Sequence, residues 1–237
     1  RFYAATDSVI TGCLFRACQV GIMLTQGTGT KLQGCVGIVI SGHRFRACVA
    51  EDVFAEEYHT ASPIDALHQD ITITGNNHVG SDVVYRMRFV HGLTIANNNV
   101  NTYRTAFSLD DEVQRAAISG NTLRLATSTV CFISKASRDI TLVGNMAYNM
   151  AGRFIHCTGA IGASSRGRIT VVSNTITDCT GPVFMAFDSG ASADIAVQGN
   201  MLAVEVSGKV PSTGEIIRST VTGHVEIVDN YVSEELL

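Results

Sequence analysis

The sequence predicts an all-β fold, a right-handed parallel β-helix solenoid of about nine coils whose strands form three parallel sheets. Three observations support this prediction: a short phrase repeated along the chain, strand-like alternation inside each copy, and a further apolar segment after each copy. We expect a single β-helix domain over residues 1–237, forming part of a longer chain, because the opening residues already belong to a repeat.

The repeated phrase closes on an asparagine, and the closing asparagines lie 22 to 30 residues apart. Two diverged early copies share the letters FRAC, while TKLQGC (30–35) is an alternative for the second of them. Strands of constant length with connections of variable length are typical of stacked coils. The copies are SVITGCLFRAC (8–18), IVISGHRFRAC (38–48), ITITGN (71–76), LTIANN (93–98), AAISGN (116–121), ITLVGN (140–145), ITVVSN (169–174), IAVQGN (195–200) and VEIVDN (225–230).

Each copy predicts three strands. The first shows apolar and polar residues in alternation, as in Ile71 and Ile73 against Thr72 and Thr74, which is the period of a strand. A second short strand follows the asparagine, and a third apolar segment comes later. No stretch of ten or more residues shows helical spacing. The third segments are VVYRMRF (83–89), TAFSLD (105–110), TVCFIS (129–134), GRFIHC (152–157), PVFMAFD (182–188) and EIIRST (215–220).

The closing asparagines have a structural interpretation. An inward-pointing amide at the bend between the first two strands carries both a donor and an acceptor, so it can hydrogen-bond to the coils above and below. The Gly or Ser that often precedes it supplies the backbone freedom that such a bend needs. We therefore expect the asparagines to stack in one bend.

The composition excludes several classes of function. Apolar residues make up 46% of the chain and charged residues 16%, which suits a packed core and not a disordered chain. The net charge is −4 and no run of Lys or Arg occurs, so we expect no nucleic-acid partner. No apolar stretch reaches the roughly 18 residues of a membrane span, so we expect none.

The seven cysteines contain no CxxC pair. Cys18 and Cys48 occupy equivalent places in two copies, which favours buried, reduced, stacked thiols over disulfides or metal ligands. His59, Asp65 and His68 lie on one long connection, but their spacing matches no metal-ligand pattern. We expect neither a metal ion nor another cofactor.

The repeat resembles the pectin-lyase-like superfamily of right-handed parallel β-helices, which includes polysaccharide lyases, glycosidases and phage tailspikes. The resemblance covers residues 8–232. A leucine-rich repeat would need LxxLxLxxN, which no copy has, and a β-propeller would need a period of about 40–45 residues.

The resemblance implies that the outer surface of the third segment lines a carbohydrate groove. Alternation then places Tyr85, Met87, Phe107 and Leu109 inside. In DVFAEEY (52–58) the same reasoning directs Asp52, Phe54 and Glu56 outward. The long connections 58–69 and 159–167 would wall the groove on one flank. The outward row is Glu56, Arg86, Arg88, Asp110, Lys135, His156 and Asp188.

Within this row, Glu56 and Asp110 are candidate catalytic residues. They lie two coils apart, about 9.6 Å at the backbone, and an inverting glycosidase separates its two carboxyl groups by about 6.5–9.5 Å. We assign Glu56 as the acid and Asp110 as the base. The candidate substrate-binding residues are Arg86, Arg88, His156 and Asp188, and the arginines suit an acidic sugar. The alternative is a solvated or salt-bridged strand face.

The leading functional prediction is a phage tailspike-like depolymerase that cleaves a bacterial surface polysaccharide by hydrolysis or elimination. The alternative is a non-catalytic carbohydrate-binding or structural stalk. A plant-cell-wall pectinase is disfavoured, because of the motifs of that class only Asp110-Asp111 has a counterpart. The chain also has no Trp for stacking on sugars. The resemblance implies a homotrimer in a virion tail or outside the cell, and the free cysteines suit assembly in a reducing cytoplasm.

Overall fold

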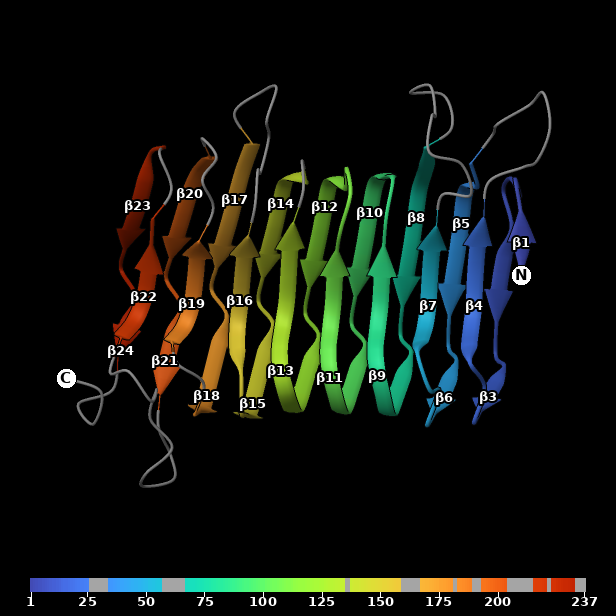
Figure 1. The fold of residues 1–237 in the computed structure, drawn as a ribbon, viewed down its shortest axis with the longest axis horizontal. Helices are drawn as coiled ribbons and strands as arrows, with labels where there is room; N and C mark the ends of the chain where they lie inside the picture. The colour runs from blue at the N-terminus through green and yellow to red at the C-terminus, as the bar shows by residue number, and fades with distance from the viewer. Residues whose placement is uncertain are drawn as a thin grey trace.

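The computed structural model describes residues 1–25, 34–56, 67–134, 137–158, 167–180, 183–188, 193–203, 215–220 and 223–232. In these ranges every regular element is a strand, and the strands stack side by side from one end of the molecule to the other (Figure 1). The fold is a parallel β-solenoid, as the repeat predicts. It makes about seven turns, a minor difference from the expected nine. Across the same ranges no helix has the length and hydropathy needed to cross a membrane.

One sheet is built from the repeated phrase itself. Its strands pair in parallel and in register, so that Ile71 lies beside Leu93, and Leu93 beside Ala116. Its members, in spatial order, are β2 (Val9–Thr11), β5 (Val36–Ser41), β8 (His68–Thr74), β10 (Val90–Ala96), β12 (Gln114–Ser119), β14 (Arg138–Val143), β17 (Gly167–Val172), β20 (Ala193–Gln198) and β23 (Val225–Val228).

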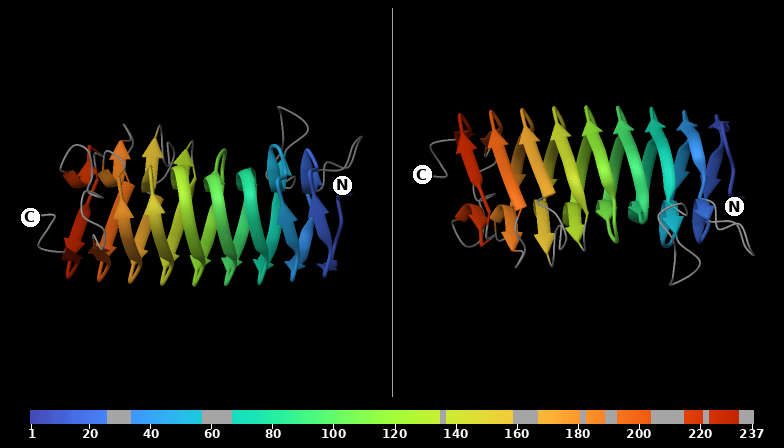
Figure 2. Two further views of the ribbon diagram at one scale, coloured as in Figure 1. Left: turned by 90° about the horizontal axis from the view of Figure 1, so that it is seen from below. Right: turned by 90° about the horizontal axis from the view of Figure 1, so that it is seen from above.

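The second and third predicted strands of each coil join into one bent sheet of fifteen strands, so hydrogen bonding defines two sheets and not three. Three long strands, β9, β11 and β13, run without a break through both positions (Figure 2). The members are β1 (Phe2–Tyr3), β3 (Leu14–Arg16), β4 (Val20–Thr25), β6 (Arg44–Arg46), β7 (Glu51–Glu56), β9 (Asn77–Met87), β11 (Asn99–Leu109), β13 (Thr122–Ser134), β15 (Met146–Met150), β16 (Arg153–Thr158), β18 (Thr175–Cys179), β19 (Val183–Asp188), β21 (Met201–Ala203), β22 (Glu215–Ser219) and β24 (Tyr231–Val232).

The core is a continuous column of inward-facing apolar side chains. Tyr85, Met87, Phe107 and Leu109 are fully buried, as alternation predicts. Equivalent residues of adjacent coils stack, and the rings of Tyr85 and Phe107 lie 5.7 Å apart at an angle of 7°. A coil therefore buries its inner face only against its neighbours, which is the physical reason that the fold needs many copies.

The closing asparagines form the predicted ladder. Each side-chain amide donates to the Oδ1 of the next asparagine at 2.8 to 3.0 Å. Each backbone N–H donates to the same oxygen, and the amide also reaches a carbonyl of the preceding coil, as Asn145 does with Ile118. The ladder consists of Asn76, Asn98, Asn121, Asn145, Asn174, Asn200 and Asn230.

His43 extends the ladder toward the N-terminus in place of an asparagine. Its backbone N–H donates to Asn76 Oδ1 at 2.9 Å, and its Nδ1 accepts the backbone N–H of Cys13 at 3.0 Å. Nε2 then carries the hydrogen and donates to the carbonyl of Ile10 at 2.9 Å. The imidazole thus reproduces both roles of the amide.

The residue before each ladder asparagine takes a left-handed backbone conformation. Where it is glycine, as at Gly75, Gly120, Gly144 and Gly199, φ lies between 61° and 66°. Three other copies place Asn97, Ser173 or Asp229 there, with φ of 51° to 56°. Asn and Asp tolerate this region better than most residues, which explains why Asn97 and Asp229 can stand where the other copies have glycine.

Candidate functional site

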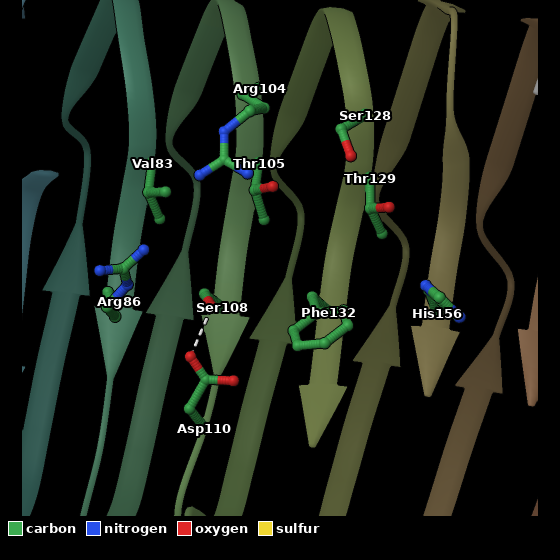
Figure 3. A pocket seen from close by; sticks show the side chains of 10 residues that line it. All are labelled: Val83, Arg86, Arg104, Thr105, Ser108, Asp110, Ser128, Thr129, Phe132 and His156. Carbon is green, nitrogen blue, oxygen red and sulfur yellow. Dashed lines mark hydrogen bonds between the residues drawn. The ribbon is translucent and has the colours of Figure 1, made fainter. Parts of the chain in front are cut away.

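The candidate site lies on the outer face of the third segment, where four strands present their side chains in register. Arg86 on β9, Ser108 on β11, Phe132 on β13 and His156 on β16 are aligned neighbours. Figure 3 shows them projecting from one face of adjacent strands. Because neighbouring strands lie about 4.8 Å apart, these side chains form a row along the solenoid axis.

A hollow of about 290 Å³ opens over this row. Most of its lining can donate or accept hydrogen bonds, and Phe132 supplies an aromatic ring. Its lining residues are Val83, Arg86, Arg104, Thr105, Ser108, Asp110, Ser128, Thr129, Phe132 and His156 (Figure 3).

Arg86 is held in place by a buried carboxylate. Its Nη1 lies 2.7 Å from Oε1 of Glu51, whose side chain is 8% exposed. Burial raises the pKa of Glu51, and the charge of Arg86 opposes that shift. The Nε of Arg86 is buried and has no hydrogen-bond partner in the described ranges. Glu51 therefore orients the guanidinium without using all of its donors.

Arg104, which precedes Thr105 on β11, lines the hollow on the side of β9 (Figure 3). It forms a bidentate pair with Asp82, with Nε–Oδ1 and Nη2–Oδ2 distances of 2.6 and 3.0 Å. The hydrogen bonds that Arg104 donates to this carboxylate raise the pKa of Arg104. Both side chains are about half exposed, so the pair fixes geometry more than it adds stability.

Asp110 is the carboxylate that lines the hollow. Ser108 Oγ donates to its Oδ2 at 2.8 Å, and Ser134 Oγ donates to its Oδ1 at 2.7 Å (Figure 3 draws the first). Ser108 lies on the same coil as Asp110 and Ser134 on the following coil, so both carboxylate oxygens of Asp110 are held in place. A carboxylate held in this way can accept a proton from a water molecule or a sugar hydroxyl.

His156 closes the far end of the row within a charged cluster. Its Nδ1 accepts from Arg153 Nη1 at 3.1 Å, and its Nε2 lies 3.4 Å from Oδ2 of Asp188. Burial, followed by the charge of Arg153, lowers the pKa of His156. Asp188 also binds Arg218 at 3.0 and 2.7 Å, and this hydrogen bonding lowers the pKa of Asp188. The lowered pKa favours the neutral imidazole, and its two ring nitrogens are already engaged by Arg153 and Asp188.

The structure brings three of the predicted site residues, Arg86, Asp110 and His156, around one hollow. Asp188 lies just beyond it, through its contact with His156. Lys135, also expected in the outward row, lies outside the described residues.

Glu56 and Arg88 share an outward row with Asp110 but do not line the hollow. The register aligns Ala55, Met87 and Leu109, so the three residues that follow them are also aligned. Glu56 and Asp110 therefore lie on one sheet, two coils apart, with Arg88 between them. Arg88 Nε lies 3.7 Å from Asp111 Oδ2. The catalytic assignment of Glu56 and Asp110 stays a prediction.

Asp52 was expected to face outward, and that expectation is wrong. Its side chain is fully buried, where it binds His78 and Ser81. The strand bends at this point, and at the equivalent bend of the next coil Val83, Val84 and Tyr85 are all buried in succession. Alternation fails across such a bend, which is also why Glu51 was overlooked.

His68 is a structural residue. It is fully buried, its Nδ1 accepts the backbone N–H of Cys35 at 3.0 Å, and its Nε2 donates to the carbonyl of Glu56 at 3.3 Å. Burial lowers the pKa of His68 to about 4. His59 and Asp65 lie outside the described residues, as do most of the connections 58–69 and 159–167. Among the residues that are described, no group of three His, Cys, Asp or Glu side chains could hold a metal ion.

Comparison with known proteins identified no relative of this chain. No protein-family model, curated protein or solved structure matches the chain. The solenoid is established by the sheet topology, and what the chain does must be argued from its own surface.

Proposed function

We propose that this chain binds an extended bacterial surface polysaccharide along the outer face of β9, β11, β13 and β16, and cleaves it as a tailspike-like depolymerase. The observation that carries the proposal is the hollow over Arg86, Ser108, Phe132 and His156. A glycan offers many hydroxyls and weakly apolar ring faces, and this lining combines fixed hydrogen-bonding groups with one aromatic ring.

The exposed part of the Arg86 guanidinium favours a glycan that contains acidic sugars, because the side chain is 27% exposed and lines the hollow. A guanidinium presents its donors in a planar fork that matches a carboxylate. Glu51 already orients Arg86 through a 2.7 Å contact, so little conformational entropy is lost when a ligand binds.

Cleavage is assigned to Glu56 and Asp110. Asp110, fixed by two serine hydroxyls, would act as the base that activates a water molecule, and Glu56 would protonate the leaving oxygen. The row that holds both carboxylates also contains Arg88. Two coils of separation leave room for a water molecule between them.

A second candidate function, binding without cleavage, is supported by the lining itself. Among the described residues that line the hollow, Asp110 is the sole carboxylate, and an inverting mechanism needs two. In this case the chain would be a binding module or a stalk that presents the glycan to another protein.

The test is to incubate the protein with a panel of bacterial capsular polysaccharides and measure reducing ends and ultraviolet-absorbing unsaturated products. We expect Glu56→Gln and Asp110→Asn each to lower turnover by about 10²- to 10⁴-fold with little loss of binding. Asp139→Asn, on the exposed surface of the other sheet, is the matched control. Full activity in both groove variants would exclude the pair as catalyst.

Binding is tested separately by titration calorimetry with whichever glycan is bound. Phe132→Ala should weaken binding by about 5- to 10-fold, because the sugar loses its stacking surface. Binding without products, still sensitive to Phe132→Ala, would favour the non-catalytic alternative. The proposed homotrimer of a virion tail is checked by analytical ultracentrifugation.

A further inference from the structure

Two thiols on the first two coils lie in direct contact. Cys18 follows β3 and Cys48 follows β6, two strands that pair in register through Phe15 and Phe45. The two Sγ atoms are 2.8 Å apart. A covalent S–S bond is about 2.05 Å long, so less than 1 Å separates this contact from a bond.

The backbone places these thiols where a disulfide fits. They occupy equivalent positions on neighbouring coils, and Val49 N donates to the carbonyl of Cys18 at 2.8 Å. Neighbouring strands lie about 4.8 Å apart, within the Cα separation of about 4.4–6.8 Å found in disulfides. Cys131 and Cys157 offer a contrast, because both are fully buried and their positions are offset by two residues.

The two thiols differ in access to solvent. Cys18 is half-buried, whereas Cys48 is 1% exposed, so the expectation that both are buried holds for Cys48 alone. Burial raises the pKa of Cys48, and contact with Cys18 and Asp52 adds to that shift. An incoming reagent therefore meets Cys18 first.

A buried acid–base cluster adjoins the second thiol. Asp52, the neighbour that acts on Cys48, accepts hydrogen bonds from Ser81 Oγ at 2.7 and 2.8 Å and lies 2.7 Å from His78 Nδ1. The other ring nitrogen of His78 binds the hydroxyl of Tyr85. All of these polar side chains lie in the interior, where an ionised group is costly unless it is paired and hydrogen-bonded.

We propose that Cys18 and Cys48 form a thiol–disulfide modification site that a small-molecule disulfide oxidises, with Asp52 as the proton acceptor of the second step. In the first step the Cys18 thiolate attacks one sulfur of the reagent. The S–S bond of the reagent breaks, and one thiolate leaves with the proton that Cys18 gave up.

In the second step Cys48 passes its proton to Asp52, and its sulfur attacks Cys18 Sγ. The second reagent thiolate leaves and takes up a proton from Asp52 through solvent. Two cysteine thiols and one external disulfide thus become one protein disulfide and two small thiols. Two electrons pass from the protein to the reagent, and the product joins the first two coils covalently.

The experiment uses the full chain and oxidised glutathione. After timed reaction, free thiols are alkylated in denaturant and the peptides are identified by mass spectrometry. We expect a linked peptide containing Cys18 and Cys48, while Cys131 and Cys157 remain alkylated. Cys13, an exposed thiol, should stop at the mixed glutathione disulfide.

Three variants separate the steps. Cys48→Ser should hold Cys18 as the mixed disulfide, and Cys18→Ser should abolish reaction at Cys48. Asp52→Asn should slow conversion of the mixed disulfide by at least about ten-fold, whereas the surface control Asp139→Asn should not. Circular dichroism checks that each variant is folded. If Asp52→Asn is not, the decay rate of the mixed disulfide in the wild type must rise by less than ten-fold per pH unit, because a ten-fold rise is the dependence of an exchange whose thiolate forms without Asp52.

Two results would overturn the proposal. One is a folded wild-type protein in which Cys18 carries glutathione indefinitely or remains a free thiol. The other is a linked peptide that forms equally fast in Asp52→Asn and wild type, which would remove Asp52 from the reaction.

Discussion

Replacing one central ladder asparagine tests whether the ladder stabilises the fold. Asn145→Ala removes the acceptor of the Asn121 backbone N–H and side-chain amide, at 3.1 and 2.9 Å, and the donor to the carbonyl of Ile118 at 2.9 Å. The side chain of Asn121 keeps its bond to Ile95, so the main loss is a buried N–H without an acceptor. Such a group costs about 1–3 kcal/mol, which is the expected fall in the free energy of unfolding.

The measurement is equilibrium unfolding in urea followed by far-ultraviolet circular dichroism. Asn99→Ala is the matched control, because the same side chain is removed from an exposed position and should cost less than about 0.5 kcal/mol. Asn230→Ala, at the half-buried end of the ladder, should fall between the two. If Asn145→Ala unfolds at the same urea concentration as Asn99→Ala, the ladder is a consequence of the fold and not a support for it.

Three further outcomes are expected. His68 has a pKa of about 4 against an ordinary value of 6.5, so the unfolded chain binds the proton first as the pH falls. The contribution of His68 to the free energy of unfolding is therefore fully present above about pH 6.5 and falls by about 3 kcal/mol toward pH 4. Urea titrations of His68→Asn should not show this decline. Gly152→Ala should prevent folding as judged by circular dichroism, because its Cβ would lie 0.9 Å from a backbone oxygen, whereas Gly144→Ala, with open space and φ of 61°, should cost about 1–2 kcal/mol. Oxidation of Cys18 and Cys48 closes a loop of about 30 residues and should raise the free energy of unfolding by about 3–4 kcal/mol. If the first two coils unfold separately from the rest, the disulfide will instead slow hydrogen exchange in those coils alone.

The solenoid could be predicted because its information is repeated. An amide such as Asn145 recurs in the same place in each coil, and the inward positions of Tyr85 and Phe107 follow from simple alternation. The number of sheets could not be predicted. Alternation gives the side of a strand on which a residue lies, but hydrogen bonding continues through the bend, as the pairing of Tyr103 with Ser81 shows.

The candidate site was partly predictable for the same reason. Arg86 and His156 were found because they alternate with buried residues on straight segments. Glu51 and Arg104 were overlooked because their roles depend on contacts between coils and on bends that break the alternation. The pairing of Arg104 with Asp82 joins residues 22 positions apart, and no local pattern carries that information.

The asparagine ladder also gives the molecule an electrical direction. Every amide from Asn76 to Asn200 donates one hydrogen bond to the Oδ1 of the next asparagine, and its remaining donation goes to backbone carbonyls and not to the previous asparagine. The amide dipoles therefore add along the axis, and each polarises its neighbours, so a bond in the middle is stronger than the same bond at an end. A coil inserted upside down, or a second solenoid joined end to end in the opposite sense, would set donor against donor. The ladder thus favours growth in one orientation only.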